Sequence, residues 1–203
     1  MFPMSPISPW GASTLTVPPN TPLSSTHPNA GHHHSPSVSP TEIIPHLYLS
    51  DLADAENPTL LASLGITHVF SAMPGFVNIP THTTHTRIPK PILRAQIPIE
   101  DNPFAELAAH LPSSTAFIRE ALRDPEANVL VHCVQGISRS ASVVCAFLMA
   151  FYGWPPTKAV TFVKTKRWIA EPNFGFVTQL HEYEKTLQQQ QQQAHGHGQG
   201  HAR

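Results

Sequence analysis

The sequence has few cysteines, few charges and no long apolar run. Only Cys133 and Cys145 are cysteines, which excludes the disulfide framework of a small secreted protein and favours a reducing cytoplasmic or nuclear location. Charged residues make up 12% of the chain and the formal net charge is -1, so we expect no nucleic-acid partner. No apolar run reaches the roughly 18 residues of a membrane helix, and no signal-peptide pattern follows Met1, so we expect no membrane association.

Both ends of the chain are of biased composition. Residues 1–40 contain no Asp, Glu, Lys or Arg and are rich in Pro, Ser and Thr, which predicts a disordered tail. Their Ser-Pro and Thr-Pro pairs are either minimal sites for proline-directed kinases or chance products of this composition. Residues 188–203, six glutamines followed by a His/Gly-rich segment, predict a second disordered tail with a helical start. One domain, residues 41–187, is left between them.

Within that domain, apolar patterns and breakers divide the chain into short strands and helices. A surface loop is predicted from Met73 to about Lys90. A helix with a basic face is predicted from Thr157 to Trp168, the basic residues being Lys158, Lys164, Lys166 and Arg167. The other predicted strands are 43–50, in two short pieces broken at Pro45, and 66–70, 92–99 and 128–131. The other predicted helices are 58–64, 104–111, 113–122, 141–151 and one ending near 187.

One stretch carries most of the chemical information. Between the predicted buried strand that ends at Val131 and the apolar helix that begins at Ala141 lies the segment 132–140, His-Cys-Val-Gln-Gly-Ile-Ser-Arg-Ser. A strand, a tight loop and a helix N-terminus form an anion site, because loop N–H groups converge there and the helix dipole adds positive potential. Gly136 allows the sharp turn, and the Arg139 guanidinium can hold two phosphate oxygens.

Cys133 lies where that positive potential is strongest. A helix N-terminus and a nearby cation favour the thiolate, which is the nucleophilic form of cysteine. Ser140 can donate a hydrogen bond to the sulfur and ease its later departure. His132 is expected to orient the loop through hydrogen bonds. Cys145 is interpreted as a small core residue, with disulfide formation to an oxidised Cys133 as the alternative.

The pattern His-Cys-x-x-Gly-x-Ser-Arg-Ser resembles the signature of cysteine-dependent protein tyrosine phosphatases, and its ending is most similar to the dual-specificity branch. Two further segments, 43–50 and 172–180, resemble the opening and close of that catalytic domain, so the similarity covers about residues 41–187. It implies an α/β fold with a central, mostly parallel sheet flanked by helices. It also implies that the backbone of the loop binds phosphate, through Val134, Gln135, Gly136, Ile137 and Ser138 together with Arg139.

The reaction needs a general acid, since an alkoxide or phenoxide is a poor leaving group. The segment Ile97-Pro98-Ile99-Glu100-Asp101-Asn102 resembles the strand and acid loop of the family, which assigns the acid to Asp101. Glu100 and Glu106 are the alternatives. Glu100 should point to the opposite face of the strand end from Asp101.

The resemblance implies hydrolysis of phosphotyrosine, phosphoserine and phosphothreonine through a phosphocysteine, without metal or organic cofactor. The expected partner is a phosphoprotein, with a protein kinase among the candidates, and the expected state is a monomer. Two alternatives stay open: a phosphatase of phosphoinositides or RNA 5′-phosphates, and a phosphoprotein-binding module without catalysis. The first is disfavoured because Val134, Gln135, Ile137 and Ser138 are uncharged, whereas polyanionic substrates favour basic loop residues.

Overall fold

A computed structural model describes residues 40–82 and 91–196 of the chain. The predicted tail 1–40 lies, apart from residue 40, outside the described residues, as do 83–90 and 197–203. The strands are β1 Thr41–Ile44, β2 Leu47–Ser50, β3 Ile66–Ala72, β4 Leu93–Ile97 and β5 Asn128–His132. The helices are α1 Leu52–Ala55, α2 Pro58–Ser63, η1 Ala108–His110 (a 3-10 turn), α3 Leu111–Ala121, α4 Arg139–Tyr152, α5 Pro156–Lys166 and α6 Phe174–Gly196.

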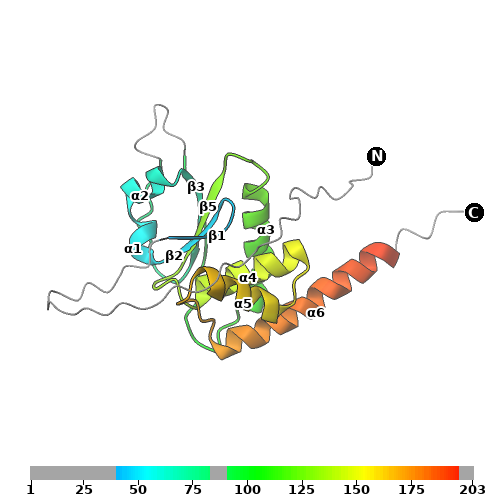
Figure 1. The fold of residues 1–203 in the computed structure, drawn as a ribbon. Helices are drawn as coiled ribbons and strands as arrows, with labels where there is room; N and C mark the ends of the chain where they lie inside the picture. The colour runs from blue at the N-terminus through cyan, green and yellow to red at the C-terminus, as the bar shows by residue number, and fades with distance from the viewer. Residues whose placement is uncertain (1–39, 83–90, 197–203) are drawn as a thin grey trace, which may run out of the picture. The chain divides into compact units, whose positions relative to one another are not determined.

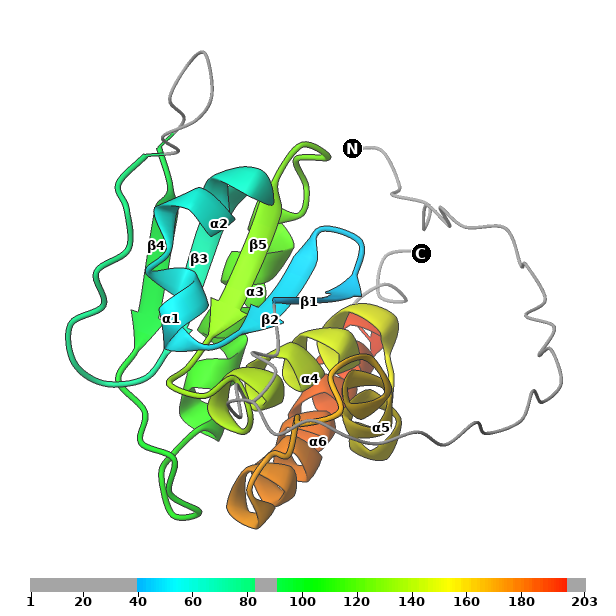
Figure 2. The same ribbon diagram turned by 60° about the vertical axis from the view of Figure 1, so that its left-hand side comes forward.

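The five strands form one mixed sheet in the order β1-β2-β5-β3-β4; all five are labelled in Figure 2, and Figure 1 shows the same fold from another side. Only the β1–β2 pair is antiparallel, and β5 pairs in parallel with β2 on one side and with β3 on the other. This confirms the predicted α/β fold with a mostly parallel sheet. The carboxyl end of β5 therefore lies at the middle of the sheet, where ligand sites of α/β folds form.

Helices cover both faces of the sheet (Figure 2). The short helices α1 and α2 lie on one face, and α3, α4, α5 and α6 lie on the other. Side chains of β5 alternate between two apolar clusters: Val129 and Val131 pack with the larger helices, and Leu130 packs with α1 and α2. Helix α4 is buried from Arg139 to Met149. The apolar stretch from Ala141 to Phe151 predicts this burial, except at its end, where Phe151 is 57% exposed.

Two predicted segments are wrong in part. The segment from Met73 onward is only partly a surface loop, because Met73, Val77 and Ile79 are buried in the cluster beside α1 and α2. They pack without regular structure, so no hydrophobic period marks them. The predicted helix 104–111 is replaced by irregular chain and η1, and Pro112 lies in the first turn of α3 instead of kinking a longer helix.

Helix boundaries also differ from the prediction. The single turn α1 was not predicted; Asp51 caps it by accepting a hydrogen bond from the Asp54 backbone at 2.9 Å. Helix α6 continues beyond Leu187 through the glutamines to Gly196, which is consistent with the good helix propensity of glutamine. No helix among the described residues is long and apolar enough to cross a bilayer.

Candidate active site

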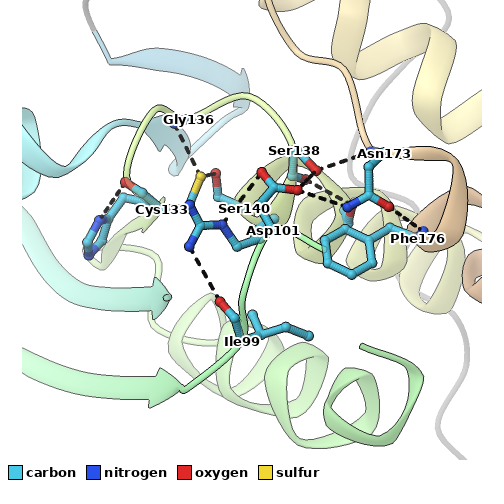
Figure 3. A network of polar contacts seen from close by, with 11 residues as sticks. Ile99, Asp101, Cys133, Gly136, Ser138, Ser140, Asn173 and Phe176 are labelled. Carbon is cyan, nitrogen blue, oxygen red and sulfur yellow. Dashed lines mark hydrogen bonds and ion pairs between the residues drawn. The ribbon is translucent and has the colours of Figure 1, made fainter. Parts of the chain in front are cut away.

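The loop between β5 and α4 surrounds the sulfur of Cys133. Strand β5 delivers the cysteine, which is 1% exposed, and Arg139 is the first residue of α4. The sulfur accepts a hydrogen bond from the Gly136 backbone N–H at 3.2 Å and another from the Ser140 hydroxyl at 3.1 Å (Figure 3). Two donors and the start of a helix stabilise negative charge on the sulfur. The structure thus brings Cys133, Gly136 and Ser140 together as predicted.

The carbonyl groups of the loop point away from the sulfur and are bound from outside. The Val134 carbonyl accepts from the Leu52 backbone at 3.2 Å, and the Ile137 carbonyl accepts from the Glu171 backbone at 2.8 Å. The Gly136 carbonyl accepts from the Arg167 Nε at 2.9 Å. In a trans peptide the next N–H points opposite to the carbonyl, so the N–H groups that follow these three carbonyls point into the loop. These are the amides of Gln135, Ile137 and Ser138.

Gly136 must be glycine for two reasons. Its φ of 64° lies in the left-handed region, which side-chain-bearing residues rarely adopt. A Cβ at this position would also lie 2.5 Å from the Ser50 carbonyl oxygen and 2.7 Å from the Arg167 Nη2. The close approach of the loop to β2 therefore depends on the missing side chain.

Arg139 is almost fully buried, with 7% of its surface exposed. Its Nη1 donates to the Ile99 carbonyl at 3.4 Å, and its Nε lies 3.6 Å from the Asp101 Oδ2. The guanidinium is thereby linked to the segment that follows β4. A buried, planar cation at a helix N-terminus is suited to two phosphate oxygens at once.

Asp101 reaches the phosphate loop from the segment after β4. Its Oδ1 accepts from the Ser138 hydroxyl at 2.7 Å and from the Asn173 side-chain amide at 2.8 Å (Figure 3). Within the described residues, Glu100 and Glu106 make no hydrogen bond or ion pair to the loop. The geometry therefore places the residue assigned as acid, and neither alternative, against the loop.

His132 is completely buried between β3 and the loop. Its Nε2 lies 2.7 Å from the Ser71 hydroxyl, and its Nδ1 lies 3.3 Å from the Cys133 carbonyl oxygen. Because a carbonyl only accepts, Nδ1 carries the proton and Nε2 accepts from Ser71. Burial lowers the pKa of His132 to about 4, so the ring is neutral at neutral pH. These contacts suit the orienting role expected for it.

The sequence predicts Arg167 on the basic face of the helix from Thr157 to Trp168, and for this residue the prediction is wrong. Its side chain is 1% exposed and lies behind the loop, bound to the Gly136 carbonyl and, through Nη1, to the Thr41 hydroxyl at 3.2 Å. Burial lowers its pKa, and the negative charges of Asp51, Asp54 and Cys133 oppose that shift. In the sequence, Arg167 is one of several basic residues at a helix end, and nothing in that pattern indicates that its side chain turns inward.

Asn173 is the second residue whose role the sequence did not reveal. In the sequence it is one residue of the segment 172–180, which resembles the close of the catalytic domain. Its backbone N–H donates to the Ser138 hydroxyl at 3.1 Å, and its side chain caps α6 by accepting from the Phe176 backbone at 2.9 Å. An asparagine before a helix is a common cap, so its contact with Asp101 could not be read from sequence.

Cys145 is buried in α4, and burial raises the pKa of its thiol to about 12. This environment suits a small core residue. Both cysteines are free. Among the described residues, no group of three or more His, Cys, Asp or Glu side chains is arranged to hold a metal ion.

A buried cysteine sulfur that accepts two hydrogen bonds, beside a buried arginine and a carboxylate held against the same loop, is the arrangement expected of a cysteine-dependent phosphatase. The family model of the dual specificity phosphatase catalytic domain matches residues 47–186. The chain belongs to the dual specificity phosphatase family, and it is a protein tyrosine/serine/threonine phosphatase.

Known relatives support this assignment. Mouse dual specificity protein phosphatase 13B is 38% identical over 148 residues, which cover 73% of this chain and 74% of the relative. Mouse dual specificity protein phosphatase 8 is 38% identical over 153 residues, or 75% of this chain but only 22% of that longer protein. The crystal structure of human DUSP28 superimposes with a TM-score of 0.63 at 33% identity, covering 73% of this chain and 95% of that one.

Proposed function

We propose that Cys133 is the nucleophile, Arg139 the phosphate clamp and Asp101 the general acid and base of this phosphatase. The Cys133 sulfur attacks phosphorus, the bond from phosphorus to the leaving oxygen breaks, and Asp101 gives that oxygen its proton. Asp101, now a carboxylate, takes a proton from water as water attacks the phosphocysteine. Ser140 donates to the departing sulfur. The observation that carries the proposal is the convergence of two donors on the Cys133 sulfur inside a loop whose amides point inward.

The loop also favours a phosphoprotein over a polyanionic substrate. Val134, Gln135, Ile137 and Ser138 add no charge, and Val134 is 43% exposed. The apolar Val134 side chain at the loop surface is better suited to a peptide than to the additional phosphates of a phosphoinositide. Phosphorylated kinase segments are candidate substrates of this kind. A reactive thiolate needs a reducing compartment, which supports a cytoplasmic or nuclear location.

Hydrolysis of an aryl phosphate by wild type and by Cys133→Ser tests the proposal. The serine variant should lose essentially all turnover, because an alcohol is not ionised at neutral pH. Asp101→Ala should keep phosphate binding and lose about 10²–10⁴-fold in kcat for a phosphopeptide. Either variant, incubated with cell extract, should also retain phosphoprotein substrates for identification.

Three results would contradict parts of this proposal. Turnover by Cys133→Ser would exclude a phosphocysteine. Absence of turnover by wild type would favour the binding-module alternative. Faster turnover of phosphoinositides than of phosphopeptides would replace the substrate class while leaving the residue roles in place.

A further inference from the structure

Asn173 holds its side-chain amide in one orientation. Its Oδ1 accepts from the Phe176 backbone N–H at 2.9 Å, and a backbone N–H can only donate. The oxygen of the amide therefore faces α6, and the Nδ2 group faces Asp101 at 2.8 Å (Figure 3). Capping the helix thus fixes a hydrogen-bond donor against the general acid.

Ser138 is held in the same way. The Asn173 backbone N–H donates to the Ser138 oxygen at 3.1 Å, so the single hydroxyl hydrogen is available for Asp101 at 2.7 Å. Both donors reach the same oxygen, Oδ1 of Asp101. The other oxygen, Oδ2, is the one that lies 3.6 Å from the Arg139 Nε, at the phosphate site.

The start of α6 is also pressed against the acid segment. A Cβ on Gly175 would lie 1.9 Å from the Pro103 carbonyl oxygen, so the two backbones approach closely only because residue 175 is glycine. This packing does not involve the Asn173 side chain. It should hold the helix start in place when that side chain is changed.

We propose that Asn173 is a positioning residue that makes Oδ2 the proton-carrying oxygen of Asp101. With donors from Asn173 and Ser138 both directed at Oδ1, a proton on Oδ1 would face two hydrogens. The proton therefore resides on Oδ2, and passes from there to the leaving oxygen as its bond to phosphorus breaks. In the second step Oδ2 receives the proton of the attacking water. This inference rests on the proposed role of Asp101 as acid.

The consequence should depend on the leaving group. A weakly acidic alcohol or phenol needs the proton of Asp101, whereas a strongly acidic phenol leaves well without it. Loss of the Asn173 donor should therefore slow phenyl phosphate and a phosphoserine peptide more than difluoromethylumbelliferyl phosphate. A residue that only stabilised the fold would slow all three equally.

Asn173→Ser is the main variant, because serine still caps a helix but cannot present an amide to Asp101. Asn173→Asp is the second variant, since it keeps the cap and the size but replaces the donor with an acceptor. Gln179→Ala is the matched control. Gln179 also ties α6 to the acid side of the site, through the Ala105 carbonyl and the Ala108 N–H, each at 2.8 Å, without touching Asp101.

We expect Asn173→Ser to lower kcat about tenfold for phenyl phosphate and less than about twofold for the activated ester, difluoromethylumbelliferyl phosphate. This is the pattern expected when the general acid is partly misplaced. Asn173→Asp should show the same preference or a larger one. Gln179→Ala should change both substrates by the same factor. In the Asp101→Asn background, the Asn173→Ser change should have no further effect on the leaving-group preference.

Equal losses for both esters in Asn173→Ser and Asn173→Asp would overturn the inference and leave Asn173 as a helix cap. An undiminished Asn173 effect in the Asp101→Asn background would overturn it as well. If Asp101→Asn itself did not lower kcat more for substrates with poor leaving groups, the assignment of Asp101 as the acid would be wrong. That result can be distinguished from the first two. Thermal unfolding of each variant identifies any loss due to folding.

Discussion

The inner and outer sides of the phosphate loop are built in different ways. The inner side consists of backbone N–H groups, the Cys133 sulfur and Arg139, all from one continuous stretch of chain. The outer side consists of the groups that donate hydrogen bonds to the loop carbonyls, which we call the outer clamp. These groups are Leu52 N, Arg167 Nε, Glu171 N and His132 Nδ1. Three of these four come from segments distant in sequence. The orientation of the inner amides therefore depends on residues outside the loop.

The two arginines show the contrast most clearly. Arg139 and Arg167 are both buried, one on each side of the loop. Arg139 is available for phosphate oxygens, whereas Arg167 binds a carbonyl of the loop and is balanced by Asp51 and Asp54. Burial and charge alone thus do not distinguish a substrate-binding arginine from a supporting one; their hydrogen-bond partners do.

The largest effect should follow a change on the inner side. Arg139→Lys keeps the positive charge but loses the planar fork for two phosphate oxygens. We expect kcat/KM for an aryl phosphate to fall on the order of 10³-fold, as when preorganised donors to a transition state are lost. Orthovanadate, which mimics that transition state, should bind more weakly by a similar factor. A loss below tenfold would show that the amides alone hold the phosphate.

A smaller but clear effect should follow a change in the outer clamp. Arg167→Met removes the donor to the Gly136 carbonyl and leaves Asp51 and Asp54 without their cation. We expect a loss of about tenfold in kcat, because the Ile137 amide, which follows the Gly136 carbonyl, is no longer held toward the phosphate. The free energy of unfolding should also fall, by about 3 kcal/mol.

Arg167→Lys separates the two contributions of this residue. Lysine retains the charge beside Asp51 and Asp54 but replaces the planar guanidinium, which joins the Gly136 carbonyl and the Thr41 hydroxyl, with a single ammonium group. Compared with Arg167→Met, this variant should regain more of the free energy of unfolding, measured in urea, than of the catalytic activity. Vanadate affinity should follow the activity. Unchanged vanadate affinity in both variants would show that the inner amides keep their orientation without Arg167.

The contrast between the two sides explains what sequence could predict. The inner side comes from one continuous stretch of sequence, in which a strand, a cysteine, a glycine, an arginine and a helix follow one another. Each of these features can be recognised from the local sequence. The acid could be placed as well, because Asp101 follows a strand parallel to β5 and so reaches the same edge of the sheet. Its assignment over Glu100 and Glu106 came from the resemblance and agrees with the contacts.

The parts that escaped prediction depend on tertiary packing. Arg167 lies in a run of basic residues, and only the folded chain shows that it alone turns inward. Asn173 caps α6, and this role alone accounts for an asparagine at that position. The sequence therefore gives no indication of its contact with Asp101. Met73, Val77 and Ile79 fill space beside α1 and α2 in irregular chain, where no period exists to detect.

The smallest expected effect in the outer clamp concerns His132, and it appears in the pH dependence of the free energy of unfolding. Its folded-state pKa of about 4 lies below the ordinary histidine value of 6.5, because burial disfavours the imidazolium. As pH falls from 7 to 5, the unfolded chain takes up a proton at this residue while the folded chain does not, so stability falls. The shift corresponds to about 2 kcal/mol over this range.

His132→Gln removes that titration, and an amide can still donate toward the Cys133 carbonyl and accept from Ser71. The free energy of unfolding in urea, measured at pH 7 and pH 5, should therefore fall by about 2 kcal/mol more in wild type than in the variant. His181→Gln, which removes an exposed histidine on α6, is the matched control. If wild type and His132→Gln changed in parallel, His132 would be protonated in the folded protein at pH 5. The clamp on the Cys133 carbonyl would then not require a neutral ring.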